Sequence, residues 1–181
     1  MLKADELVAE FGVLRELAEI IPVRFRAVPS YDIYFPEWKE LVLIADRLVA
    51  EHPDLAGIVI THGTATLEET AYVLHLSMKV SIPVVLVGAQ RPASALSTDA
   101  SMNLANAIRT AASPQARGLG VLVLLNDEIQ AARDVRKSST YRMQTFRTDD
   151  FGALGGTQPE RHRRISLRTA KRPAHPRHRF R

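Results

Sequence analysis

Hydroxyl groups and one lysine follow the ends of the predicted strands, where they could hydrolyse an amide. Ser30 follows the first of these strands, Thr64 the second and Lys137 the last. A neutral lysine can accept the proton of a nearby hydroxyl and so activate it as a nucleophile. Positive neighbours favour the neutral form, so Arg133 and Arg136 are predicted to lower the pKa of Lys137 if they lie close to it and are desolvated. Taken singly, each residue is more simply explained as part of a solvated loop.

Two further polar residues, Ser97 and Asp99, lie in a long polar loop after the strand predicted at 83–89. In an open α/β sheet the carboxyl ends of the parallel strands converge on one crevice, and ligands bind there. The serine and the aspartate are therefore expected to support the same site as the lysine and the hydroxyls.

Several other kinds of chemistry are not expected of this sequence. It contains no cysteine, which excludes thiol catalysis, disulfides and thiolate metal sites. No glycine-rich dinucleotide fingerprint follows a strand, and there is no Walker-type phosphate loop. The histidines lack the spacing of metal ligands. His75 fits a half-buried helix position, and His62 could either face a ligand or cap the backbone. We therefore expect neither a cofactor nor a metal ion.

The stretch at 57–70 places Thr64 at the junction of a strand and a helix. Residues 57–60 form a short β-branched run, typical of a strand buried on both faces. Small and polar residues break the run, and Thr66 then stands three residues before Glu69, the spacing of a capping box at a helix start. A helix N-terminus favours negative charge, so this junction suits a ligand. An ordinary, well-capped strand–loop–helix joint fits the same pattern.

The whole chain alternates between strand-like and helix-like segments. Helices are predicted over 3–20, from Pro36 to His52, over 67–79 and over 102–112, and strands over 23–28, 57–60, 83–89 and 121–125. Such alternation with short loops is typical of an α/β protein with a doubly wound, mostly parallel sheet and helices on both faces. The segment 23–28 alternates apolar and basic residues, which predicts a strand at or near a sheet edge.

Charge is distributed unevenly along the chain. The 181 residues include 24 Lys and Arg against 20 Asp and Glu, a formal net charge of +4. Nine of the basic residues and none of the acidic ones lie from Arg161 onward, so residues 1–160 carry 15 basic and 20 acidic groups, a net of −5. We therefore divide the chain into an α/β domain over 1–156 and a basic tail over 157–181. The tail has almost no apolar periodicity and is expected to be disordered.

The basic tail has two interpretations. It is either a polybasic arm for nucleic acid or an anionic membrane, or a sequence foreign to the fold, such as an out-of-frame read-through. The second is favoured because the α/β pattern stops abruptly at the glycine cluster 152–156, so neither nucleic acid nor a membrane is an expected partner. The N-terminus has no apolar signal region, and no apolar run could span a bilayer. A cytoplasmic protein is therefore expected, unless a truncated N-terminus has lost a signal.

Five segments, taken in order and with their spacing, resemble the bacterial L-asparaginase/glutaminase family. They are HGTATLEETAY at 62–72, PVVLVGAQRP at 83–92, STDASMNL at 97–104, GVLV at 120–123 and RDVRK at 133–137. The resemblance covers about residues 1–156. It implies a Rossmann-like N-terminal α/β domain, hydrolysis of asparagine (sometimes glutamine) to the acid and ammonia, no cofactor, and a homotetramer built from dimers.

The resemblance also implies roles for individual residues. Thr64 matches the first threonine of the family's His-Gly-Thr-Asp-Thr motif, and Lys137 matches the lysine that works with it. Ser30 matches the serine that receives the substrate carboxylate, and the backbone of Gly88 and Ala89 would lie beside the substrate amide. The predicted catalytic residues are thus Thr64 and Lys137, supported by Ser97 and Asp99. The predicted substrate-binding set is Ser30, Tyr31, Gly63, Ala65 and Ala89.

The sequence departs from the family pattern at several places. The N-terminal Thr-Gly-Gly-Thr-Ile-type loop, whose threonine is generally taken as the nucleophile, is absent, and the basic tail stands in place of the smaller C-terminal domain. Ala65 replaces the motif's aspartate, which orders the threonine–lysine pair and holds the substrate's α-ammonium, and Tyr31 stands where glutamine is common. These departures suggest a truncated chain with impaired activity.

Two alternatives therefore remain open. One is a catalytically inert remnant that serves as a ligand-binding or assembly module. The other is the amidotransferase subunit that acts on misacylated tRNA and shares this fold.

Overall fold

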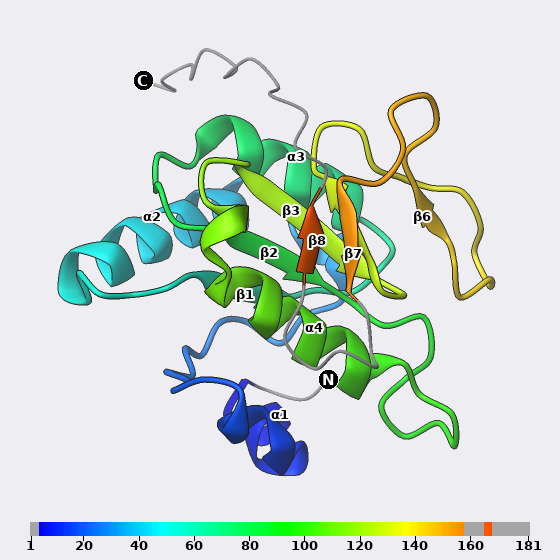
Figure 1. Cartoon of the computed structure of the whole chain (residues 1–181), viewed down its shortest axis with the longest axis horizontal. Coiled ribbons are helices and arrows are strands. Elements are labelled where there is room, and N and C mark those ends of the chain that lie inside the picture. Colours follow the sequence, from blue (N-terminus) through cyan, green and yellow to red (C-terminus); the bar gives the residue numbers. More distant parts are fainter. Residues whose placement is uncertain (1–3, 158–164, 168–181) are drawn as a thin grey trace.

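The computed structural model describes residues 4–157 and 165–167 (Figure 1). Its helices are α1 (Ala4–Glu10), α2 (Phe35–Glu51), α3 (Leu67–Ser77) and α4 (Ala100–Ala112), with short 3-10 helices η1 (Gly12–Glu16), η2 (Ser30–Asp32) and η3 (Pro114–Ala116). Its strands are β1 (Ile58–Thr61), β2 (Val84–Val87), β3 (Val121–Leu125), β4 (Glu128–Ala131), β5 (Arg136–Lys137), β6 (Phe146–Arg147), β7 (Gly155–Thr157) and β8 (Ile165–Leu167). Within these residues no helix is long and apolar enough to cross a membrane.

The strands form a six-stranded sheet and a separate two-stranded sheet of β5 and β6. The larger sheet has the order β1-β2-β3-β4-β7-β8, in which β1, β2 and β3 run parallel and each later strand is antiparallel to its neighbour. The predicted α/β class is confirmed, but the antiparallel extension is not evident from the sequence pattern. It begins at a tight hairpin, where Asn126 and Asp127 both have positive φ, at 49° and 63°, as a two-residue hairpin turn requires.

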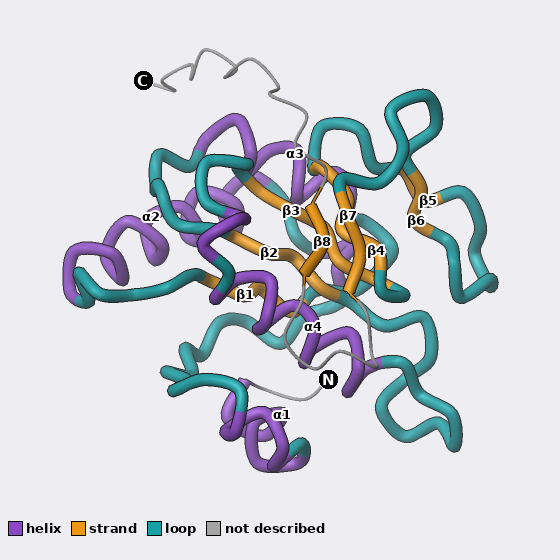
Figure 2. The backbone as a smooth tube through the Cα atoms, in the orientation of Figure 1, coloured by secondary structure: helices purple, strands orange, loops and turns teal. Residues whose placement is uncertain are grey.

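Helices cover both faces of the sheet, as the sequence predicts (Figure 2). One face packs against α4, and the other packs against α2 and α3. The first face carries Val85, Val87, Leu122 and Leu124, and the second carries Val84, Leu86, Val121 and Val123. α3 connects β1 to β2, and α4 connects β2 to β3, so both connections move across the sheet in the same direction. Their helices nevertheless lie on opposite faces of the sheet. The two crossovers therefore have opposite hands, so one is left-handed, against the strong preference for right-handed crossovers.

The strand predicted at 23–28 does not form. This segment belongs to no sheet, although it lies beside the outer edge of β1. A cavity of about 300 Å³, lined mostly by apolar side chains of this segment, β1, α1, α2 and α4, borders both the segment and β1. The prediction is wrong for a physical reason: a strand needs a hydrogen-bonded partner, and no such ladder joins the segment to β1.

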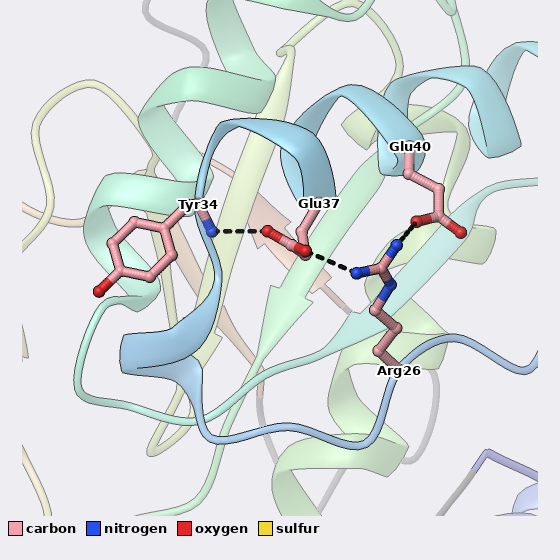
Figure 3. A network of polar contacts seen from close by, with 4 residues as sticks. All are labelled: Arg26, Tyr34, Glu37 and Glu40. Atoms are coloured by element: carbon pink, nitrogen blue, oxygen red, sulfur yellow. Dashed lines mark hydrogen bonds and ion pairs between the residues drawn. The ribbon is translucent and has the colours of Figure 1, made fainter.

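Ion pairs to α2 hold this segment in place instead (Figure 3). Arg26 Nη1 donates to Glu37 Oε1 at 2.8 Å, and its Nη2 donates to Glu40 Oε2 at 3.0 Å. The other oxygen of Glu37 accepts the backbone N–H of Tyr34 at 3.0 Å, at the start of the helix. These contacts fix both ends of the short stretch that contains Ser30.

The predicted N-terminal helix is shorter than expected. α1 ends at Glu10, and a separate 3-10 helix begins at Gly12. Glycine is a poor residue for a helix interior, which explains the break. Leu14 is nevertheless fully buried in the same core cluster as α4, so the apolar side chains of this segment still reach the core.

Most of the predicted disordered tail lies outside the described residues, at 158–164 and 168–181. The exceptions are Thr157, the last residue of β7, and β8, which pairs antiparallel with β7, so the prediction of disorder is wrong for these residues.

Candidate active site

Thr64 and Lys137 meet, although they lie in distant parts of the chain. Thr64 lies in the loop between β1 and α3, and Lys137 lies in β5. Lys137 Nζ donates hydrogen bonds to Thr64 Oγ1 at 2.8 Å and to Thr64 O at 3.0 Å. The predicted hydroxyl and the predicted lysine are therefore in direct contact.

The surroundings of Lys137 favour its neutral form. Burial lowers the pKa of the Lys137 ammonium, and the nearby carboxylate of Glu68 partly opposes this change. The predicted cause is wrong, because Arg133 forms an ion pair with Asp134 at 3.3 Å and Arg136 forms one with Asp149 at 3.8 Å. Desolvation, rather than neighbouring positive charge, accounts for the direction.

The two-stranded sheet that carries Lys137 is attached to the domain by three kinds of contact. Buried Val135 and Phe146 pack in the same core cluster as α3. The backbone N–H of Lys137 donates to Glu68 Oε2. On the far side of the hairpin, Gln90 Nε2 donates to Arg142 O at 3.2 Å. The position of the lysine thus depends on tertiary contacts and not on strand pairing with the main sheet.

Ser30 packs directly against the loop that carries Thr64. Its side chain is buried, with 4% of its surface exposed. A Cβ placed on Gly63 would lie only 2.8 Å from Ser30 Oγ and 3.0 Å from Ser30 Cβ, so any other residue at this position would force Ser30 to shift. Thr66 Oγ1 donates to Ser30 O at 2.6 Å, and this bond joins the two loops.

The predicted capping box is wrong. Thr66 does occupy the N-cap of α3, but no side-chain hydrogen bond caps this helix. The hydroxyl of Thr66 binds the Ser30 loop instead, and the charge of Glu69 acts on His62. A tertiary contact between two loops has replaced the local one.

The end of β2 lies against Thr64. A Cβ on Gly88 would lie 2.8 Å from the carbonyl oxygen of His62 and 3.0 Å from Thr64 Cγ2. Ala89, the next residue, is therefore brought next to the Thr64 loop. Ala65 and Tyr31 are both exposed, Tyr31 at 61%, and no hydrogen bond described in this structure joins either side chain to Thr64 or Lys137.

Ser97 and Asp99 stabilise the loop after β2 rather than contacting Lys137. Asp99 accepts the backbone N–H groups of Gln90 and Arg91 at 3.0 and 2.9 Å. Ser97 Oγ accepts from Arg91 Nη1 at 2.6 Å. Both residues thus hold the turn that follows Ala89.

Asn103 is a structural residue of the site to which sequence reasoning gave no role. Its side chain is 2% exposed and links three loops. Nδ2 donates to Gly88 O at 3.0 Å and to Asp99 Oδ2 at 2.8 Å, while Oδ1 accepts the N–H of Asn126 at 3.0 Å. An asparagine on the buried face of a helix, four residues after Asp99, is the signal that could have revealed it.

His62 is buried beside this cluster. Its Nδ1 lies 2.7 Å from Gly63 O, so the neutral ring carries its proton on Nδ1, and Nε2 has no hydrogen-bond partner among the described residues. Burial lowers the pKa of His62. Across residues 4–157 and 165–167, no group of three or more His, Asp or Glu side chains could hold a metal ion.

Comparison with known proteins places this arrangement in a family. The family profile described as "Asparaginase, N-terminal" matches residues 1–171. Over 154 residues the chain is 42% identical to the "Probable L-asparaginase periplasmic" of Haemophilus influenzae, covering 85% of this chain and 43% of that protein. Over 153 residues it is 47% identical to "L-asparaginase 2" of Bacillus subtilis, covering 83% of this chain and 40% of that protein.

A solved structure agrees with these sequence matches. The crystal structure of the probable cytoplasmic L-asparaginase from Campylobacter jejuni superposes with a TM-score of 0.86 at 36% identity, over 92% of this chain and 50% of that one. The chain thus spans less than half the length of these two relatives. The chain belongs to the asparaginase family and corresponds to its N-terminal domain.

Proposed function

We propose that this chain carries the threonine–lysine part of an asparaginase-type amidohydrolase, which hydrolyses the side-chain amide of asparagine or a related amide to acid and ammonia. The hydrogen bond between Lys137 Nζ and Thr64 Oγ1 carries this proposal. It is supported by the lowered pKa of the lysine and by the names of the relatives, which are asparaginases.

The chemistry follows from the two groups. Neutral Lys137 accepts the proton of Thr64 Oγ1, and the oxygen attacks the amide carbonyl carbon. The lysine then returns the proton to the leaving nitrogen, which departs as ammonia. Water hydrolyses the resulting ester to the acid and restores the threonine.

The remaining predicted residues hold the substrate. Ser30 and Gly63, which pack against each other beside Thr64, would receive the substrate carboxylate, with exposed Tyr31 next to them. The backbone at Ala89 would lie next to the reacting amide, with Ser97 and Asp99 holding the turn that follows it. Ala65 offers no carboxylate, so an α-ammonium group would be bound poorly.

The proposal extends to the organisation of the protein. The asparaginase-like domain is assigned to 1–156 and the basic tail to 157–181, and Thr157 and residues 165–167 of this tail join the sheet of the domain in β7 and β8. A cytoplasmic location is favoured by the name of the Campylobacter jejuni relative, while the name of the Haemophilus influenzae relative includes the periplasm. Assembly into a homo-oligomer is the state that the family resemblance implies.

Ammonia release by the purified 181-residue chain tests the activity. Asparagine and glutamine are supplied separately, and Thr64→Val and Lys137→Met serve as matched variants. We expect slow release above the background of both variants. Equal signals from all three proteins would contradict the activity and favour the alternative, an inert or ligand-binding domain. Ala65, which replaces the aspartate of the family motif, is the observation that favours that alternative.

A further inference from the structure

Glu68 links the two halves of the candidate site. It lies in the first turn of α3, four residues after Thr64, and its Oε2 accepts the backbone N–H of Lys137. The same lysine extends its side chain back to Thr64. The backbone of Lys137 and its ammonium group are thus bound by two residues of one short stretch, 64–68.

The hairpin of β5 and β6 needs such a link. It shares no strand pairing with the larger sheet, and its own ladder joins only two pairs of residues. Apolar packing of Val135 and Phe146 holds the hairpin against α3. Hydrogen bonds from Gln144 to Glu128 and from Thr148 to Gln130 tie the β6 side of the hairpin to β4. On the β5 side, the hydrogen bond from the Lys137 backbone to Glu68 ties the strand to α3.

Glu68 is also the carboxylate whose charge acts on Lys137. The charged neighbours on the lysine's own segment form other ion pairs: Arg136 pairs with Asp149, and Arg133 pairs with Asp134. On α3, the next carboxylate, Glu69, acts on His62. On β6, Phe146 presents its ring 5.9 Å from Lys137 Nζ. Ala65 supplies no charge.

We infer that Glu68 is a positioning residue for the Thr64–Lys137 pair: its carboxylate holds the lysine backbone at α3 and supplies the negative charge beside the ammonium. The importance of this role for catalysis rests on the proposed function. The hydrogen bond to the Lys137 backbone and the effect of the Glu68 charge on Lys137 can be measured without substrate. A carboxylate there opposes the lowering of the Lys137 pKa by burial.

Titration of Lys137 tests the charge. The chain has five lysines, so ¹³Cε-lysine labelling gives few signals, and Lys137→Met identifies the relevant one. In Glu68→Gln the amide oxygen can still accept the lysine N–H, but the charge is lost. We expect the titration midpoint of Lys137 to fall by about one pH unit. Glu69→Gln is the matched control and should leave this midpoint unchanged.

Amide hydrogen exchange tests the anchoring. In Glu68→Ala, exchange at the Lys137 amide should be about tenfold faster, while Glu68→Gln should remain near the wild-type rate. Circular dichroism shows whether each variant is folded, and the isosteric Gln variant keeps the test valid if the Ala variant is not. An unchanged midpoint in Glu68→Gln, or unchanged exchange in a folded Glu68→Ala, would overturn the inference. Neither result depends on ammonia release, so the proposed function is judged separately.

Discussion

Lys137 Nζ donates a hydrogen bond to Thr64 Oγ1 at 2.8 Å, although 73 residues separate the two in the chain. A protonated lysine can only donate in such a contact, whereas a neutral lysine can also accept the threonine's proton. The protonation state of Lys137 therefore decides whether the pair can activate the hydroxyl.

Ammonia release should rise with pH. Burial lowers the pKa of Lys137 below its ordinary value of 10.5, so the neutral, active form gains population at a lower pH than for a free lysine. A rate profile between pH 6 and 10 should show a rising limb with a midpoint below 10.5. Lys137→Arg, which stays protonated, should abolish that limb and lower the rate by about 10²- to 10⁴-fold. A profile without a rising limb would contradict the role of Lys137.

Replacing Ala65 by aspartate should improve the use of free asparagine. The substituted side chain would stand beside Thr64 and could pair with the substrate's α-ammonium group. Losing one partner of such a desolvated pair costs about 2–5 kcal/mol, so gaining it should raise kcat/KM for asparagine at least tenfold. The measurement is best made on a longer form of the chain that carries the family's N-terminal threonine loop. Equal kcat/KM with and without Ala65→Asp would contradict the prediction.

Gly88→Ala should destabilise the domain. The added Cβ would lie 2.8 Å from the carbonyl oxygen of His62, which belongs to the backbone and cannot move away cheaply. We expect a loss of about 1–3 kcal/mol in the free energy of unfolding, measured by urea denaturation. Gly12→Ala is the control, because its Cβ would meet nothing within 4 Å, and its effect should stay within about 0.5 kcal/mol.

Removing the side-chain amide of Asn103 should weaken both the fold and the site. Asn103→Leu leaves the partly buried N–H of Asn126 and the carbonyl oxygen of Gly88 without this partner. Each such group costs about 1–3 kcal/mol. Met102→Ala, at an exposed neighbouring position of α4, is the control. Similar urea midpoints for the two variants would show that Asn103 is not the link that its hydrogen bonds indicate.

Acidification should destabilise the domain through His62. Its folded-state pKa lies below its ordinary value of 6.5, so the unfolded chain binds more protons between those two values. Stability is therefore lost as the pH falls below about 6.5, because protonation would place an N–H at buried Nε2 without an acceptor among the described residues. His62→Asn, whose amide can still donate to Gly63 O, should reduce the fall in melting temperature between pH 7.5 and 5.5. A slope equal to that of wild type would exclude His62 as the cause.

The sequence by itself determined the α/β class and most of the framework. The apolar runs of β2 and β3 predict strands buried on both faces, and the helical stripes predict α2, α3 and α4 with nearly correct bounds. These features are local, because the period of apolar residues reports which face a segment buries. The position of Thr64 at the carboxyl end of a parallel strand could also be expected. Its meeting with Lys137 could not, because Lys137 lies in the separate sheet of β5 and β6.

Only the tertiary structure decided which partner each polar group takes. Periodicity cannot show that the segment at 23–28 lacks a partner strand, nor that the sheet continues antiparallel through β4. The local signal at Thr66 predicts a helix cap, yet its hydroxyl binds the Ser30 loop, and Glu68 binds the backbone of Lys137. A hydrogen-bond donor binds an acceptor that lies within about 3 Å, and folding places acceptors from residues far away in the sequence at that distance.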